Sequence, residues 1–193
     1  MTSKEDFVYD MRVIRSTRFV YSKRMEVKSK VKSFTINTLS VLAIFVSVYL
    51  LANASGISAL DLKRISITLI GISLLALWMS LDTPPSELSR KAADAHQCAR
   101  EISEIYRACK YDQIELIKAV ECYETILSRY PENHDPLDRA NALYNDRRKN
   151  PEKAERLTCV NTVWKYNLSC YSPVGLALGW FLLVALIQIF FPL

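Results

Sequence analysis

The chain has 193 residues and a hydrophobic fraction of 50%, enough for a few membrane-spanning helices and one modest soluble domain. Its formal net charge of +5 is unevenly placed, because residues 1–32 alone hold nine Lys and Arg against four Asp and Glu. The first long apolar run begins only after this basic segment, so we do not expect a cleaved secretory signal.

Two uncharged apolar runs, Phe34–Ala52 and Ile65–Leu81, organise the rest of the chain. Each is about long enough to cross a hydrocarbon core of ~30 Å at a rise of ~1.5 Å per residue. The link between them, residues 53–64, is too short for a domain and begins with turn-forming residues. The pattern therefore predicts a transmembrane helical hairpin over residues 33–82.

The orientation of this hairpin is predicted from its flanking charges. Basic residues concentrate just before the first span, at Lys23, Arg24, Lys28, Lys30 and Lys32. Because Lys and Arg are retained on the cytoplasmic side, we expect the N-terminus and residues 83–172 to lie in the cytoplasm. A third apolar segment, Val174–Leu193, then leaves its C-terminus outside.

Residues 1–32 are predicted to form an amphipathic helix that runs into the first span. Apolar side chains recur at helical spacing, at Phe7, Met11, Ile14, Tyr21 and Met25, and the opposite face is basic. Such a helix either lies on anionic lipid or packs on the soluble domain. We favour packing, with the basic residues fixing the topology.

Each predicted span also carries a stripe of small polar residues on one helical face. The stripes are Ser33, Asn37, Ser40 and Ser47 in the first span and Ser66, Ser73 and Ser80 in the second. Small hydroxyl residues commonly let helices pack closely in lipid. Alternatively, these faces line a water-filled path in an oligomer, which without charged residues has little ion selectivity. From the stripes alone we favour packing.

After the hairpin, residues 84–130 show the clearest periodicity in the chain, with Thr83 a candidate N-cap and Pro84 suited to the first helical position. Thirteen positions alternate steps of four and three residues: Leu88, Ala92, Ala95, Ala99, Ile102, Tyr106, Cys109, Gln113, Leu116, Val120, Tyr123, Leu127 and Tyr130. This heptad pattern predicts one long helix, in which any break is expected at residues 111–113. Isoleucines beside the seam indicate that it also packs on other helices of its own chain.

Prolines mark the predicted helix boundaries in the rest of the chain, after residue 130. Pro131 is predicted to close the long helix, and Asp135, Pro136 and Asp138 to start the next, over about residues 137–148. A further helix is expected from residue 150, and Pro173 is expected to open the third span.

The third span contains a GxxxG pattern at Gly175 and Gly179, which predicts close packing against a neighbouring helix. Tyr166, Tyr171 and Trp180 are expected to anchor its ends at the membrane interface.

No catalytic or metal-binding pattern stands out. The five cysteines form no CxxC pair, so we expect reduced thiols and no zinc cluster, and GxxxxGK[ST], GxGxxG, HExxH and GxSxG are absent. His134 lies in a turn beside acidic residues, and we interpret it as structural because no nucleophile or second base accompanies it. The weakest alternative is an enzyme that uses His134, Asp135 and Asp138. We predict no enzymatic activity, no cofactor and no direct nucleic-acid binding.

The end of the long helix reads Y-x-x-I-L-x-x-Y-x-x-N-H-x-x-x-D, marked by Tyr123, Tyr130, Asn133, His134 and Asp138. With the hairpin and the long helix, over about residues 10–170, it resembles the SLATT family of bacterial membrane effectors. The resemblance implies an anti-phage role as a pore-forming or membrane-disrupting effector of the inner membrane, released by a sensor, a nucleotide-signal synthase or a reverse transcriptase. We expect the protein to be a homo-oligomer. It implies no catalytic residues, and the third span departs from the family's two-span core.

The sequence thus predicts an all-α integral membrane protein in four parts. These are a cytoplasmic basic helix (1–32), a transmembrane hairpin (33–82), a cytoplasmic helical domain (83–172) and a C-terminal transmembrane helix (173–193). The rival function is a non-conducting membrane scaffold that recruits a partner through the heptad helix.

Overall fold

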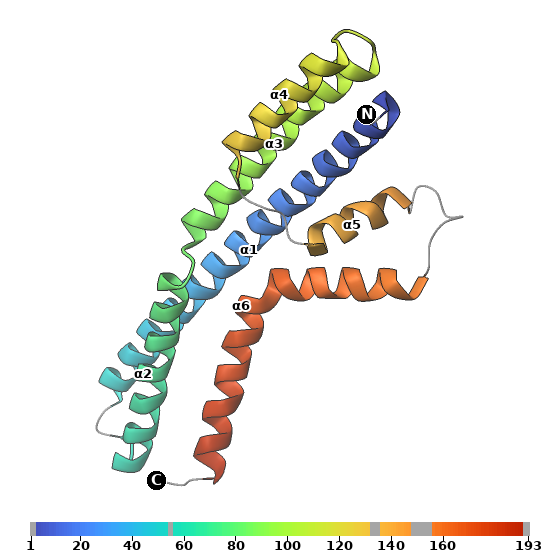
Figure 1. Ribbon diagram of the computed structural model, residues 1–193. Helices are drawn as coiled ribbons and strands as arrows, with labels where there is room; N and C mark the ends of the chain where they lie inside the picture. The colour runs from blue at the N-terminus through green and yellow to red at the C-terminus, as the bar shows by residue number, and fades with distance from the viewer. Residues whose placement is uncertain (1–2, 54–55, 132–135, 148–155, 191–193) are drawn as a thin grey trace. The chain divides into compact units, whose positions relative to one another are not determined.

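The structure is a computed structural model that describes residues 3–53, 56–131, 136–147 and 156–190. These residues form six α-helices and no strand (Figure 1): α1 (Lys4–Ala52), α2 (Ala59–Leu81), α3 (Pro85–Lys110), α4 (Leu116–Arg129), α5 (Pro136–Arg147) and α6 (Arg156–Phe190). The predicted all-α class is confirmed. The helices divide into two compact units, a first of Met1–Val27 with Ser89–Ser169 and a second of Lys28–Leu88 with Cys170–Leu193.

Helix α1 joins the predicted basic helix and the first apolar run without interruption, as expected. It contains no Gly or Pro over its whole length, so nothing in the sequence breaks its hydrogen-bond ladder. Ser3 and Asp6 cap its start reciprocally: the Asp6 amide donates to Ser3 Oγ at 3.2 Å, and the Ser3 amide donates to the Asp6 carboxylate at 3.3 Å.

The core of the first unit forms where α1, α3 and α4 meet. Its fully or nearly fully buried residues are Met11 from α1, Cys98, Ile102 and Cys109 from α3, and Ala119 and Ile126 from α4. Tyr21 and Met25 are buried as well, so the apolar face of the N-terminal helix packs on protein, which is the interpretation favoured from the sequence. Burial of this face contributes ~25 cal/mol for each Å² of apolar surface removed from water.

The predicted single long helix is wrong, because the chain turns back between α3 and α4 (Figure 1). The break falls at the expected residues: Asp112 has a φ of 55°, in the left-handed region, and the Gln113 amide donates to the Ala108 carbonyl at 2.8 Å. Folding back lets the heptad face bury itself within one chain. Ala99, Ile102 and Cys109 of the seam are fully buried without a second copy.

The second unit is built on an antiparallel hairpin of α1 and α2 (Figure 1). Its core consists of Leu39 from α1, Ile72, Ala76 and Met79 from α2, and Ala177 from α6. Ser58 caps α2 by accepting a hydrogen bond from the Asp61 amide at 3.1 Å.

Two helix starts differ from the sequence prediction. Helix α3 begins at Pro85, one residue later than expected, whereas α5 begins at Pro136 as expected. Pro173 does not open a separate span but lies inside α6, which is continuous from Arg156 to Phe190. An interior proline removes one ladder hydrogen bond, and apolar helices tolerate this where neighbouring groups compensate.

Candidate functional site

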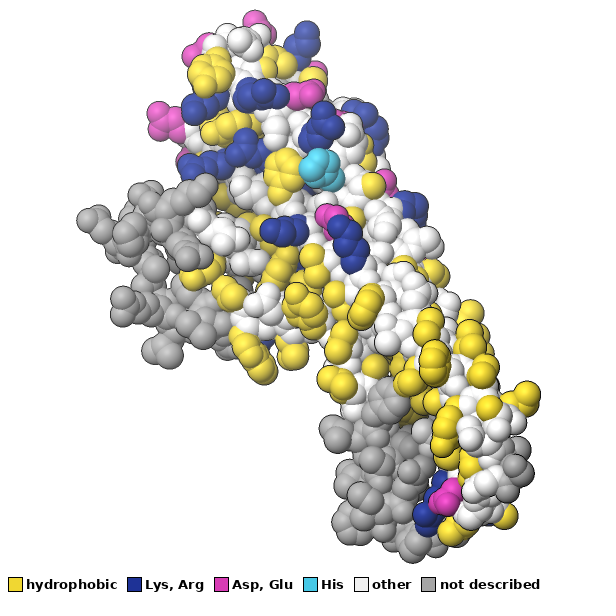
Figure 2. Space-filling view, turned by 180° about the vertical axis from the view of Figure 1, so that it is seen from behind, with side chains coloured by type: hydrophobic (Ala, Val, Ile, Leu, Met, Phe, Trp, Pro, Cys, Tyr) yellow, Lys and Arg dark blue, Asp and Glu magenta, His cyan; other side chains and the backbone are white. Residues whose placement is uncertain are grey.

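The helices of the second unit expose an unusual amount of large apolar surface. On α1 the exposed fraction reaches 75% at Phe45 and 86% at Leu51, and α2 exposes Ile70, Leu74 and Trp78. Figure 2 shows hydrophobic side chains over this hairpin, while Lys, Arg, Asp and Glu gather over the first unit. Contiguous apolar surface of this kind marks contact with lipid or with another protein.

Within the part of the chain that the structure describes, two helices are long and apolar enough to cross a membrane, one running from Lys4 to Ala52 and one beginning at Ala59. In the most apolar 18-residue stretch of each helix, only 11% and 17% of the residues, respectively, are buried inside the chain. A core helix of a soluble protein would be mostly buried, so these values favour lipid as the medium around both helices. The third predicted span, Val174–Leu193, stays a prediction because the side chains beyond Trp180 are not described.

The polar stripes predicted from the sequence lie largely on the exposed side of the hairpin. Asn37, Ser40, Ser47, Ser73 and Ser80 are exposed, and Ser33 and Ser66 are half-buried.

Three of the stripe hydroxyls donate to the carbonyl four residues earlier in their own helix. Ser40 donates to Ile36 at 3.0 Å, Ser47 to Ala43 at 2.8 Å and Ser73 to Leu69 at 2.9 Å. Because these three donors are already satisfied, Ser40, Ser47 and Ser73 can face lipid, water or a second chain without an unpaired hydroxyl proton. The α1–α2 contact itself is made by other residues, those of the second unit's core.

The close helix contact at a glycine lies on α2 and not at the predicted GxxxG pair. A Cβ at Gly71 would come within 3.1 Å of the Trp180 ring, so the indole packs directly on the α2 backbone. Gly175 and Gly179 have nothing within 4 Å of an added Cβ, and with Leu74 and Trp78 they line an open apolar groove of about 510 Å³. Helical spacing pointed to the GxxxG pair, but only the tertiary contact identifies Gly71.

Polar contacts close the charged end of the hairpin. Lys32 Nζ lies 3.2 Å from the Asp82 carboxylate, and the Ser29 hydroxyl donates to the Pro85 carbonyl at 2.7 Å. The Lys32 side chain is only 6% exposed. This lysine therefore takes part in packing the hairpin, in addition to the role in membrane topology that its charge predicts. The pair joins the last charged residue before the first apolar run to the first residue after the second.

A buried ion pair lies within the first unit. Arg24 on α1 donates from its guanidinium to the Asp138 carboxylate on α5 at 2.7 Å, and the two side chains are 6% and 0% exposed. Arg24 also donates to the Ser169 hydroxyl of α6 at 3.4 Å. From the sequence, Arg24 was expected to fix the membrane topology by its charge, and Asp138 to stabilise the start of a helix. Neither role predicts a contact between the two side chains.

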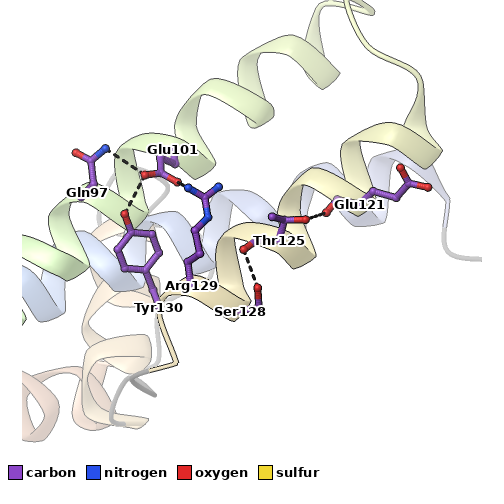
Figure 3. A network of polar contacts seen from close by, with 7 residues as sticks. All are labelled: Gln97, Glu101, Glu121, Thr125, Ser128, Arg129 and Tyr130. Carbon is purple, nitrogen blue, oxygen red and sulfur yellow. Dashed lines mark hydrogen bonds and ion pairs between the residues drawn. The ribbon is translucent and has the colours of Figure 1, made fainter.

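The family-motif residues Tyr123 and Tyr130 lie in and after α4, whereas Asn133 and His134 fall outside the described residues. The Tyr130 hydroxyl donates to Glu101 at 2.9 Å, and Glu101 also accepts from Gln97 and pairs with Arg129 (Figure 3). Burial and the hydrogen bond to Glu101 raise the pKa of Tyr130. These contacts hold the end of α4 against α3.

Tyr123 contributes to the core through its ring. It meets Phe7 of α1 edge-on at a centroid distance of 5.6 Å. Burial, followed by the nearby charge of Asp10, raises the pKa of Tyr123 to about 12. Tyr166, expected at the membrane interface, instead donates its hydroxyl to the Val20 carbonyl at 3.2 Å.

Metal binding finds no support among the described residues, where no three His, Cys, Asp or Glu side chains are grouped to hold an ion. His96 packs edge-on against the Phe19 ring at 5.4 Å, and Cys98 and Cys109 are buried thiols. Burial raises the pKa of the Cys98 thiol, which disfavours the reactive thiolate. The absence of a cofactor and of enzymatic activity stays a prediction.

Long apolar helices with exposed faces, in a chain that also has a charged helical unit, are typical of a helical membrane protein. The chain belongs to SLATT_5, the SMODS and SLOG-associating 2TM effector domain family 5, whose family model matches residues 1–189. No curated protein and no solved structure matches the chain. The family resemblance is confirmed, and the match includes most of the third apolar segment that was expected to depart from the family pattern.

Proposed function

We propose that this chain is the membrane effector of a bacterial anti-phage defence system that oligomerises and permeabilises the inner membrane when triggered. The family supports the effector role, since its members are described as two-transmembrane effector domains. The observation that supports pore formation is the exposure of Ser40, Ser47 and Ser73 in the apolar parts of α1 and α2, where the other exposed residues are mostly apolar. In an assembly, such a stripe is the natural face to turn toward water.

The proposed path is polar but uncharged. Ser40, Ser47 and Ser73 keep their hydroxyl protons in intrahelical bonds and offer oxygen lone pairs outward. Such a lining passes water and small ions with little charge selectivity, because it carries no ring of fixed charge. Depolarisation of the cell, followed by abortive infection, is the expected consequence.

The trigger is proposed to act on the first unit. A sensor, a nucleotide-signal synthase or a reverse transcriptase is the kind of partner that the family resemblance suggests. Whatever its identity, it must bind the closed and open arrangements with different affinity, since equal affinity shifts no population. The N-terminus and the charged unit are proposed to lie in the cytoplasm, where such a partner is found.

Membrane potential in bacteria tests the pore directly. A voltage-sensitive dye would compare wild type with Ser40→Leu/Ser73→Leu after induced expression, at matched levels in the membrane. Val41→Leu/Leu74→Ile is the matched control, because it changes neighbouring exposed apolar residues instead. We expect wild type and control to depolarise the cells and the serine variant to fail. If wild type causes no depolarisation even when its genomic neighbours and a phage trigger are supplied, pore formation is refuted.

A non-conducting scaffold is the second candidate, and exposed apolar residues near the α3–α4 turn favour it. Tyr111 and Ile117 are 66% and 74% exposed on the charged unit. The heptad seam first assigned to recruitment is used inside the chain, so a partner would have to use this surface. A scaffold predicts protection from phage without depolarisation, and protection that survives Ser40→Leu/Ser73→Leu but is lost in Ile117→Ser.

A further inference from the structure

A pocket in the first unit brings together three arginines from three helices. Arg18 of α1, Arg90 of α3 and Arg129 at the end of α4 line a hollow of about 300 Å³. Asp94 is the one carboxylate among the described residues that line it. These described lining side chains therefore carry an excess of positive charge.

Arg18 supplies a fixed charge at this pocket. Its exposed fraction is 4%, and its guanidinium donates to the Tyr130 carbonyl at 3.4 Å. A guanidinium stays protonated under all ordinary conditions, so burial does not neutralise it. The pocket thus includes a permanent cation that is already desolvated and held in place.

Arg90 and Arg129 are far more exposed than Arg18, with side-chain exposures of 67% and 58%. Arg90 lies 3.9 Å from Asp94, and Arg129 lies 3.5 Å from Glu101. The exposed Arg90–Asp94 pair contributes only ~0–1 kcal/mol, so a ligand oxyanion can replace Asp94 at small cost. Replacing Glu101 costs more, because its side chain is only 19% exposed and loses the nearby charge of Arg129. Glu101 keeps its bonds from Gln97 and Tyr130 if Arg129 turns away (Figure 3).

We propose that this pocket binds a phosphoryl group, held by Arg18, Arg90 and Arg129. Planar guanidinium groups match the oxygens of phosphate in two-pronged hydrogen bonds, and the volume suits a compact anion. The phosphoryl group belongs either to a free phosphorylated compound or to a lipid headgroup. The assignment does not depend on pore formation, since it concerns only the charged unit.

Inorganic pyrophosphate is the probe, with the full-length protein in detergent and in nanodiscs of phosphatidylcholine or phosphatidylglycerol. Calorimetric titration at constant ionic strength would compare wild type with Arg90→Gln/Arg129→Gln. Arg100→Gln/Arg107→Gln is the control, because it removes the same charge from exposed positions on α3 outside the pocket. The variant Arg90→Lys/Arg129→Lys keeps the positive charge but loses the planar guanidinium groups that form bidentate hydrogen bonds.

We expect saturable pyrophosphate binding that weakens about tenfold or more in the glutamine variant, less in the lysine variant, and under about twofold in the control. Equal binding in both kinds of nanodisc identifies a free phosphorylated compound as the ligand class. Competition by phosphatidylglycerol, dependent on Arg90 and Arg129, identifies a lipid headgroup. Absence of saturable binding in every arm, or equal loss in the control, would overturn the proposal.

Discussion

Arg24 and Asp138 form an ion pair at 2.7 Å between two side chains that are almost completely removed from solvent. The arginine lies on α1, a few residues before the apolar half of that helix, and the aspartate lies in the first turn of α5. A charge buried this deeply requires its counter-charge, since an isolated ion inside a protein is costly. The pair therefore fixes α5 on α1 in one register.

Removal of one partner is expected to destabilise the first unit strongly. Asp138→Ala or Arg24→Met leaves one buried charge without its partner, at a cost of about 3–5 kcal/mol. The double variant Arg24→Met/Asp138→Leu should be more stable than either single variant. Thermal unfolding in detergent measures this, with the exposed neighbour Arg139→Ala as the control. Single variants that melt like the control would show that the pair contributes nothing to folding.

Gly71 is expected to tolerate no side chain, unlike the GxxxG glycines. Gly71→Val should displace the Trp180 ring, because even a Cβ would lie 3.1 Å from it, and the tryptophan emission spectrum should shift. An added Cβ at Gly175 or Gly179 meets no atom within 4 Å among the described residues. A change in cross-linked oligomers in Gly175→Ala or Gly179→Ala would therefore indicate a contact with another molecule rather than with these residues. An unchanged emission spectrum in Gly71→Val would contradict the close packing.

Alkaline pH is expected to destabilise the first unit through Tyr123. Its pKa is raised to about 12 in the folded protein, whereas an unfolded tyrosine titrates near about 10. The folded state thus holds the phenol proton more tightly, and this stabilisation is complete below pH ~10 and is lost as the pH rises through ~12.

Tyr123→Phe, which cannot ionise, should lose less stability than wild type between pH ~10 and ~12. Melting temperatures across this range measure the difference, and Tyr111→Phe, at an exposed position, is the control. Parallel pH curves for wild type and Tyr123→Phe would count against a buried phenol at this position.

The turn between α3 and α4 is expected to depend on its backbone conformation. Asp112 adopts a φ of 55°, which Asn and Gly accept readily and a β-branched residue does not. Asp112→Val should therefore cost about 1–2 kcal/mol, whereas Asp112→Asn should cost much less. The asparagine variant also reports on the Lys4–Asp112 ion pair, because it removes only the charge. Equal melting temperatures for the two variants would argue against the left-handed turn.

Several features of this protein follow from its sequence alone. Uninterrupted apolar runs indicate the apolar parts of α1 and α2, because a helix pairs the backbone donors and acceptors within such a segment. The absence of Gly and Pro from α1 makes it one helix, and Pro136 marks the start of α5. The order of hairpin and long helix, together with the short motif ending at Asp138, indicates the family that residues 1–189 match.

Only the tertiary structure decides which residues meet. Heptad spacing does not distinguish one long helix from two helices folded back, since both bury the same face; burial of Ile102 and Cys109 within the chain decides it. Gly71 and Trp180 lie on different helices, so no local pattern joins them. Arg24 and Asp138 likewise come together across more than a hundred residues, because a buried charge is stable only where folding brings its partner to it.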